Sequence, residues 1–404
     1  MLVACILGVN LMHTNLPQEI LATKSGKQAD EILRKCVHCG FCNATCPTHQ
    51  ITGDELDGPR GRIYLIKEML EGSETTQTTL NHLDNCLTCL SCETTCPSGV
   101  NYGELVEIGR ETIAKENIRS LYSKIKRWVI CQIFPYPNRF MPLYKLATLF
   151  RLLPKNCATS TSKELVDNSS AKVLLLDGCV QSVITPEINN AIYDLLAAKN
   201  IQAVSIKSVQ CCGAIHHHNG MPEKSLELIK SNIDHWWPQI EEGCEAIIMT
   251  ASGCGSMLKD YHRLLSHDSN YSEKARRISE LTQDACEYFS NQIFTKKNST
   301  TINIAFHPPC TLQHSQNLPE TVEPILRRAG FNVIDFKDKH LCCGSAGTYS
   351  ILQPELATQL RNNKLTAMEA TRPDVIATAN IGCILHLQKG TDIPVKHWRE
   401  LVKL

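Results

Sequence analysis

The hydrophobic pattern of the last 230 or so residues alternates short apolar runs with amphipathic stretches. Two of these runs, "AKVLLLDGC" and "TINIAFHPPC", are typical of buried strands that end at a cysteine. Each is followed by a helical stretch, a second strand ("IQAVSI" or "FNVIDF"), a Cys-Cys-Gly segment, another helix, a third strand ("EAIIMTASGC" or "DVIATANIGC") and a short helix. Strands that alternate with helices favour parallel pairing. The pattern therefore predicts two α/β units with parallel strands.

The cysteines of the two units keep the same spacing. In both, 31 residues lie between the first cysteine and the adjacent pair, and 41 or 39 lie between the pair and the last cysteine. Such a repeated interval indicates an internal duplication. Because ligands gather at the carboxyl ends of parallel strands, each copy is expected to bring four thiols to one place. The two sets are Cys179, Cys211, Cys212 and Cys254, and Cys310, Cys342, Cys343 and Cys383.

Three interpretations of the adjacent cysteines compete. A vicinal disulfide is strained and leaves the other two cysteines unexplained, and inert buried cysteines do not account for the duplicated spacing. A metal or cluster bound by four sulfurs explains most of the pattern. Gly213 and Gly344 would let the backbone pass close to whatever lies there. The histidines at 216–218 have no counterpart in the second copy and are expected to form a polar loop.

The first third of the chain contains two cysteine runs, "CVHCGFCNATCP" and "CLTCLSCETTCP". Both have the spacing C-x2-C-x2-C-x3-C-P, in which three thiolates hold one [4Fe–4S] cluster and the fourth reaches the other cluster. Zinc sites use paired CxxC segments or Cys/His mixtures rather than four cysteines in one short run. The predicted ligands are Cys36, Cys39, Cys42 and Cys96 for cluster one, and Cys86, Cys89, Cys92 and Cys46 for cluster two.

The segment between the runs, "ITGDELDGPRGRIYLIKEMLEG", predicts a polar turn and then a helix. Its apolar face would carry Ile63, Ile66, Met69 and Leu70. Arg60 and Arg62 stand at its start, where they would offset the negative charge of a thiolate-bound cluster, meet a partner, or simply be solvated.

Residues 117–163 contain no acidic side chain, and basic residues alternate there with aromatic ones. Such a stretch is suited to a membrane interface with anionic lipid, or to docking on another subunit. Prolines 135, 137, 142 and 154 are expected to divide it into short helices. The polar stretch "NCATSTSKELVDNSSAK" that follows predicts a boundary.

Length and composition set the remaining limits. With 404 residues, two or three domains are expected. We predict an α-helical two-cluster ferredoxin-type domain at 1–116, a basic aromatic helical connector at 117–170, and α/β repeats at 171–300 and 301–404. Lys+Arg and Asp+Glu both total 41, so nothing indicates nucleic-acid binding. The 21 cysteines, mostly in metal-type spacings, indicate a reducing compartment.

The N-terminus "MLVACILGVNL" is too short to span a bilayer and lacks the features of a signal peptide. A translation start at Met12 would remove it altogether. No later segment is apolar for long enough to predict a transmembrane helix. No GxGxxG nucleotide motif appears either, so a flavin would have to be held by another chain.

The combination of these motifs resembles the iron–sulfur subunits of bacterial glycolate oxidase, also called glycolate dehydrogenase. The resemblance covers nearly the whole chain and includes the segments "SNIDHWWP", "TASGCG", "CTLQHSQ", "LCCGSAGTYS" and "TANIGC". The Cys-Cys-Gly (CCG) units alone are shared with heterodisulfide reductase, the small subunit of anaerobic glycerol-3-phosphate dehydrogenase, and lactate-utilisation proteins.

The resemblance implies an enzyme in which FAD-containing subunits oxidise glycolate to glyoxylate. This chain would then pass electrons to a membrane quinone or another acceptor, from a peripheral position on the cytoplasmic face of the inner membrane. Two alternatives remain open at this stage. One is the equivalent subunit for lactate or glycerol 3-phosphate, and the other is a thiol–disulfide reductase that acts at the CCG cysteines.

The sequence departs from the fullest CCG motif, which ends in CxxC and supplies a fifth thiolate. Met257 and His386 occupy those positions here. Neither side chain matches a thiolate in iron–sulfur chemistry, so additional clusters in the repeats are a candidate feature only.

Overall fold

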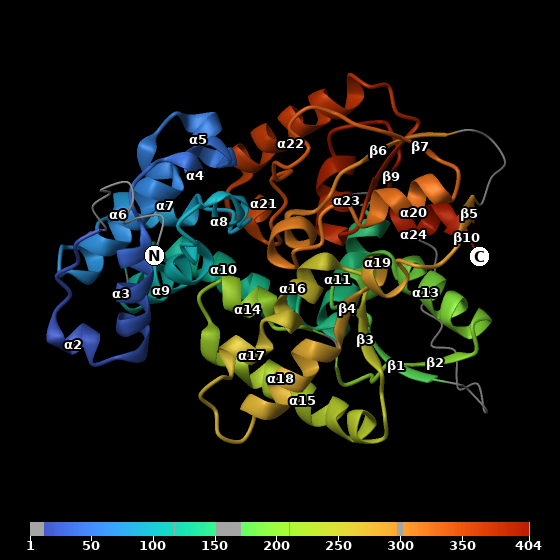
Figure 1. Ribbon diagram of the computed structural model, residues 1–404, viewed down its shortest axis with the longest axis horizontal. Helices are drawn as coiled ribbons and strands as arrows, with labels where there is room; N and C mark the ends of the chain where they lie inside the picture. Colours follow the sequence, from blue (N-terminus) through green and yellow to red (C-terminus); the bar gives the residue numbers. More distant parts are fainter. Residues whose placement is uncertain (1–11, 117, 151–170, 210, 297–301, 404) are drawn as a thin grey trace. The chain divides into compact units, whose positions relative to one another are not determined.

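The protein is described here by a computed structural model, which covers residues 12–116, 118–150, 171–209, 211–296 and 302–403. The apolar N-terminal residues and most of the Ser/Thr-rich boundary lie outside this description. The chain divides into two compact units (Figure 1), one formed by Met1–Lys124 with His340–Leu360 and the other by Ile125–Lys339 with Arg361–Leu404. The residue boundaries predicted for the four segments stay a prediction.

The first unit is built from helices, drawn mainly in blue in Figure 1. Its elements are α2 (Gln18–Leu21), α3 (Lys24–Lys35), α4 (Phe41–Ala44), α5 (Pro47–Thr52), a 3₁₀ turn (Glu55–Asp57), α6 (Pro59–Leu70), α7 (Gln77–Asp84), α8 (Ser91–Thr95), α9 (Tyr102–Lys115) and α21 (Tyr349–Leu352). Pro59 starts α6 at a position where its missing N–H has no helical partner to lose. The predicted apolar face of α6 is buried as expected, with Ile63, Ile66 and Leu70 in the core.

The second unit contains two four-stranded parallel sheets with the same strand order, β2-β1-β3-β4 and β7-β6-β8-β9. The strands of the first sheet are β1 (Ala171–Leu176), β2 (Ile201–Val204), β3 (Ala246–Met249) and β4 (Thr282–Asp284). Those of the second are β6 (Asn303–Phe306), β7 (Asn332–Ile334), β8 (Val375–Thr378) and β9 (Val395–His397). The predicted order of strands and helices in each repeat is confirmed. The fourth strands, β4 and β9, were not predicted because they are only three residues long.

Helices cover the sheets and connect their strands. In the first repeat they are α12 (Gln181–Ile184), α13 (Pro186–Ala198), α14 (Ala214–His218), α15 (Pro222–Glu241), α16 (Ser252–Lys259), α17 (Tyr261–Leu264), α18 (Ser272–Leu281) and α19 (Ala285–Tyr288). In the second they are a π-helical turn (Thr311–Ser315), α20 (Val322–Arg328), α22 (Pro354–Glu369), α23 (Ile381–Gln388) and α24 (Trp398–Leu401). A short antiparallel pair joins β5 (Thr295–Lys296) to β10 (Val402–Lys403).

The two repeats share a hydrophobic core. Val173 and Leu175 of β1 belong to the same buried cluster as Ile304 and Phe306 of β6, together with Trp398 of α24. Burying this much apolar surface between the repeats makes them one folding unit rather than two independent ones.

The connector forms α10 (Leu121–Ile133) and α11 (Pro137–Leu149). Pro137 begins α11, as expected for a proline at the first helical position. Pro142, however, lies inside α11 and does not end it, so the expectation that it divides the connector was wrong. Within the described residues, no helix is long and apolar enough to cross a membrane.

Candidate functional site

The eight cysteines of the two runs gather in two groups within the first unit. Cys36, Cys39 and Cys96 lie close enough to Cys42 for their negative charges to act on it. Burial, and then these neighbouring thiolates, raise the pKa of Cys42 to about 11. The same four cysteines line one pocket. Four sulfurs around one pocket, whose charges disfavour the thiolate form of Cys42, are suited to a cationic iron centre, which stabilises thiolates.

The second group forms around the buried Cys92. Burial raises its pKa strongly, and the charges of Cys89, Cys86 and Cys46 add to the effect. The fourth cysteine of each run thus lies with the first three of the other run. Cys42 also acts on Cys92, so the two groups are neighbours.

A repeated backbone conformation positions the cysteines. Gly40 and Leu90, which precede the third cysteine of each run by two residues, are left-handed with φ of 80° and 61°. His38 and Thr88 are left-handed at equivalent positions as well. Left-handed backbone at non-glycine residues costs about 1 kcal/mol or more each and is concentrated at functional sites. In the second run it aims the Thr88 amide at the Cys86 sulfur, at 3.4 Å.

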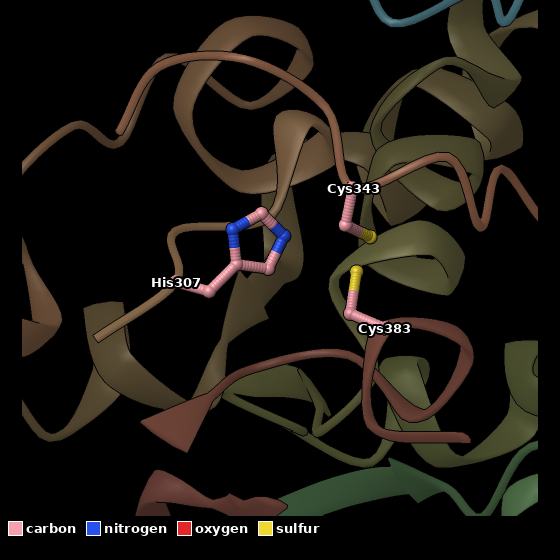
Figure 2. A group of neighbouring side chains, drawn as sticks. All are labelled: His307, Cys343 and Cys383. Carbon is pink, nitrogen blue, oxygen red and sulfur yellow. The ribbon is translucent and has the colours of Figure 1, made fainter. Parts of the chain in front are cut away.

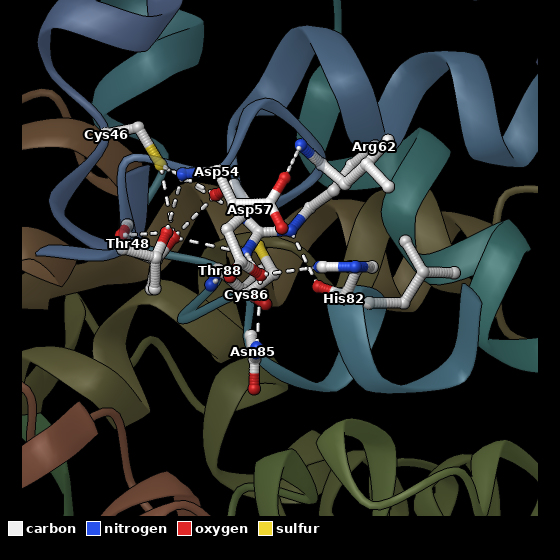
Figure 3. Close-up of polar contacts among 12 residues, drawn as sticks. Cys46, Thr48, Asp54, Asp57, Arg62, His82, Asn85, Cys86 and Thr88 are labelled. Atoms are coloured by element: carbon white, nitrogen blue, oxygen red, sulfur yellow. Dashed lines mark hydrogen bonds and ion pairs between the residues drawn. The ribbon is translucent and has the colours of Figure 1, made fainter. Parts of the chain in front are cut away.

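Arg62 lies buried beside the second group, with a side chain only 1% exposed (Figure 3). Its guanidinium is 3.9 Å from the Cys46 sulfur and 3.3 Å from the Asp57 carboxylate. It also donates to Thr48 Oγ1 at 3.1 Å and to the carbonyl of His82 at 2.7 Å. Of the three roles open to Arg62, the structure therefore favours the offsetting of thiolate charge.

Asp57 holds the guanidinium in place. Its carboxylate also contacts His82 Nδ1 at 3.0 Å and accepts a hydrogen bond from Asn85 at 3.1 Å. Burial alone would raise the pKa of Asp57, but these two contacts and the charge of Arg62 outweigh it and lower the pKa. The aspartate is therefore ionised and paired beside the cysteines.

Cys86 is stabilised as a thiolate by groups that the sequence analysis did not identify. Burial would raise its pKa, but Arg62 and Arg110 outweigh burial and lower it. Tyr102 donates a hydrogen bond to the sulfur at 3.4 Å. Arg110 donates to the carbonyls of Leu83 and Cys86, at 2.8 and 2.6 Å, so it also fixes the turn. Both residues lie on α9. In the sequence they look like ordinary polar positions of an amphipathic helix, so nothing marks their contact with Cys86.

Arg60 is more exposed and lies near the first group. It donates to Glu55 at 2.6 Å and to the carbonyl of His38 at 3.4 Å. Glu55 raises the pKa of Arg60 most, and the thiolates of Cys42 and Cys39 add to the effect. The two arginines thus serve different cysteine groups.

In the first repeat, the structure brings all four predicted cysteines together at the carboxyl ends of the strands. Cys211 contacts Cys179 and Cys212, and Cys212 contacts Cys254. Hydrogen bonds from Cys211 and Cys254 stabilise the Cys212 thiolate and lower its pKa. The contact with Cys179, and then that with Cys212, raises the pKa of Cys211, and the contact with Cys212 raises the pKa of Cys254. Negative charge in this group therefore favours Cys212, with Cys211 and Cys254 as its hydrogen-bond donors.

The Cys-Cys-Gly turn of this repeat is fixed by neighbouring helices. Asn232 donates to the carbonyl of Cys211 and Tyr261 to that of Cys212, both at 2.8 Å. Gly213 has a φ of 94°, and a Cβ there would lie 3.0 Å from Ser225 Oγ. The close approach that the glycine permits is thus to α15, not to the cysteine group as expected. A Cβ on Gly344 would likewise meet Ala357 of α22, at 2.7 Å.

The histidines at 216–218 do not form the polar loop that was expected. They lie on α14, and His216 is fully buried with its ring edge toward Tyr136, at 6.2 Å between ring centroids. Met257, at one of the positions of the missing fifth thiolate, packs into the hydrophobic core of the first repeat.

In the second repeat, Cys310 follows β6 and Cys383 lies on α23, directly after β8. Cys342 and Cys343 belong to the His340–Leu360 segment of the first unit. His307, which lies between β6 and Cys310, is not among the residues predicted from the sequence. A ring nitrogen of His307 and the sulfur of Cys383 lie within 4.8 Å of each other. Figure 2 labels these two side chains together with Cys343.

Family comparisons agree with this division of the chain. Residues 32–100 match a 4Fe-4S dicluster domain, and residues 173–259 and 304–388 match a cysteine-rich CCG domain. The chain is 46% identical to the glycolate oxidase iron-sulfur subunit of Escherichia coli (strain K12), over 97% of this chain and 98% of that protein. It is 29% identical to the probable glycolate oxidase iron-sulfur subunit of Bacillus subtilis (strain 168), over 89% of both chains.

A more distant relative covers only part of the chain. Lactate utilization protein A of Bacillus licheniformis is 23% identical over 57% of this chain and 98% of its own length. The full-length match at higher identity decides between the two families. The chain therefore belongs to the family of glycolate oxidase iron–sulfur subunits.

Proposed function

We propose that this chain carries electrons from flavin-containing partner subunits, which oxidise glycolate to glyoxylate, to a quinone or another acceptor at the membrane. The observation that carries the proposal is the gathering of eight cysteines into two neighbouring groups, each completed by the fourth cysteine of the other run. Oxidation of glycolate releases two electrons, and iron–sulfur clusters pass electrons one at a time.

Each cysteine group fits a [4Fe–4S] cluster. Cys36, Cys39, Cys42 and Cys96 would hold cluster one, and Cys86, Cys89, Cys92 and Cys46 would hold cluster two. The pocket lined by the first group offers space for a cluster. The Thr88 amide and the Tyr102 hydroxyl would donate hydrogen bonds to the ligating sulfur of Cys86. Burial, hydrogen bonds to sulfur and nearby charge then set the reduction potentials.

The CCG repeats are proposed to hold further iron–sulfur centres. In the first repeat the support is direct contact among Cys179, Cys211, Cys212 and Cys254. In the second, the same sequence spacing selects Cys310, Cys342, Cys343 and Cys383.

The repeats also provide a route between their two sites. The Ser252 hydroxyl on α16, two residues before Cys254, is 2.7 Å from that of Thr311, which follows Cys310. Gln316 donates to the carbonyl of Ser252 at 2.9 Å. This contact between residues next to Cys254 and Cys310 supports electron transfer between centres held by the two repeats.

The connector is proposed to place the chain on an anionic membrane, on the cytoplasmic face. Exposed apolar side chains recur at helical spacing on α10, namely Ile125, Trp128 and Val129, and on α11, namely Leu143, Leu146 and Leu149, with Phe150 directly after it. Lys126 and Lys145 lie among them, and no acidic residue occurs between 117 and 163. Apolar stripes flanked by basic residues suit the interface of an anionic bilayer.

The test uses the complex with its flavin subunits, purified anaerobically. In Cys36→Ser we expect glycolate still to reduce the flavin while electron transfer to an external dye is lost. Cys244→Ala is the matched control, because Cys244 is a buried cysteine outside all four sets. Full dye reduction by Cys36→Ser would contradict the proposal. A large loss in Cys343→Ser with little loss in Cys36→Ser would instead favour a thiol–disulfide reaction at the CCG pairs.

A further inference from the structure

His307 lies at a point in the second repeat where a metal ligand would be expected. It directly follows β6, it precedes Cys310 by three residues, and its main-chain amide is bonded to the carbonyl of Ala377 on the neighbouring strand β8. The histidine is therefore held at the carboxyl end of the parallel sheet, where ligands bind in folds of this type.

The imidazole of His307 is completely buried, and neither ring nitrogen has a hydrogen-bond partner among the described residues. An unsatisfied buried polar group costs about 1–3 kcal/mol, so such a group calls for an explanation. One of these nitrogens lies within 4.8 Å of the Cys383 sulfur. Metal–nitrogen and metal–sulfur bonds of about 2.0–2.3 Å together span up to about 4.3 Å, so a small side-chain shift at most lets one metal atom bond both.

Two polar side chains at comparable places of the second unit have hydrogen-bond partners in the protein, whereas the buried His216 resembles His307 in having none for either ring nitrogen among the described residues. Asp177 occupies the position after β1 that His307 occupies after β6, and it accepts hydrogen bonds from Tyr193 at 3.0 Å and Ser205 at 2.7 Å. Both ring nitrogens of the buried His397 have main-chain partners. The His307 ring therefore does not make the hydrogen bonds with protein that Asp177 makes at the equivalent position of the first repeat.

We propose that a ring nitrogen of His307 is a ligand of the iron–sulfur centre in the second repeat. His307 would provide a ligand in place of the fifth thiolate that this chain lacks. It does so from a different position, since His386 occupies the place of that thiolate in the sequence motif. The inference rests on the proposal that this repeat holds a centre at all. The first repeat, with Asp177 engaged by Tyr193 and Ser205, keeps sulfur ligands only.

The two centres would then differ in chemistry. Histidine in place of cysteine raises the reduction potential of an iron–sulfur centre because a neutral nitrogen replaces an anionic sulfur. The centre of the second repeat would accept electrons more readily than that of the first, which gives transfer between the repeats a direction.

The test is pulsed electron paramagnetic resonance on the anaerobically purified complex, with histidine labelled with ¹⁵N. We expect a ¹⁵N coupling in the wild type that is lost in His307→Gln. His386→Gln is the matched control, since His386 is also buried and lies three residues from Cys383; it should keep the coupling. His307→Cys should lose the coupling and retain the iron, which covers the case in which His307→Gln does not fold.

Iron and sulfide analysis of the same samples separates the inference from the proposed function. About eight irons per chain would mean two ferredoxin-type clusters alone and would overturn both the proposed centre and its ligand. A higher iron content without any ¹⁵N coupling, or with a coupling that survives in His307→Gln, would overturn only the role of His307. Zinc in place of the additional iron would also overturn it.

Discussion

Replacing Arg62 by methionine should lower the reduction potential of cluster two. Arg62 is a buried cation whose guanidinium lies 3.9 Å from the Cys46 sulfur, so it stabilises the more negative, reduced cluster. Methionine has a similar length and no charge. Removing the cation makes the added electron less stable, and the potential becomes more negative.

The size of the change follows from Coulomb's law. The added electron is spread over the cluster, so we place it about 7 Å from the guanidinium; at an effective dielectric constant of about 20 the interaction is about 2 kcal/mol. For a one-electron couple, about 59 mV corresponds to a tenfold change in equilibrium constant, so the expected shift is roughly 100 mV.

The assay is a redox titration of the anaerobic protein followed by electron paramagnetic resonance. Arg62→Lys keeps the charge and should shift the potential of cluster two by less than about 30 mV. Asp57→Asn combined with Arg62→Met removes both charges of the pair and should return the potential toward that of the wild type. Equal shifts in the lysine and methionine variants would refute the electrostatic reasoning, as would no shift in the methionine variant.

Three further predictions concern stability and membrane binding. Burial lowers the pKa of His397 from 6.5 to about 4. The stability that depends on its neutral form is therefore present above pH 6.5 and is lost as the pH falls toward 4. Urea unfolding should show about 2 kcal/mol of stability lost between pH 7 and pH 5, and His397→Gln should abolish this loss. Gly213 and Gly243 both have φ of 94°, but only Gly213 is crowded, so its alanine variant should be less stable by at least about 1 kcal/mol in the same assay; equal losses would mean that crowding is unimportant. Trp128→Ala with Leu146→Ala should weaken co-sedimentation with anionic vesicles at low salt, and absence of wild-type binding there would reject lipid contact.

Local patterns were sufficient to predict much of this fold. The apolar runs of the repeats predicted the first three parallel strands of each repeat and their succession along the chain, since buried strands are marked by continuous apolar residues. The spacing of the cysteines selected the thiols that the structure brings together in the first unit and in the first repeat. The short strand Thr282–Asp284 carries no such signal, because a three-residue polar segment pairs only through its backbone.

Residues that act through tertiary contacts were harder to find. Arg110 and Tyr102 reach Cys86 from α9, and nothing in their local sequence marks that contact. His307 was next to a predicted ligand, but its burial, its unsatisfied nitrogens and its position within 4.8 Å of the Cys383 sulfur are tertiary features that the local sequence does not show. Pro142 was misjudged because a helix supported by packing tolerates an internal proline.

The most direct test of the account is rapid-freeze electron paramagnetic resonance of the anaerobic complex after mixing with glycolate. We predict that reduction of the flavin is followed by the signal of at least one reduced [4Fe–4S] cluster, and that this signal is absent in Cys36→Ser or Cys86→Ser for the cluster concerned. Flavin that becomes fully reduced while every cluster stays oxidised would contradict the claim that this chain carries the electrons of glycolate oxidation.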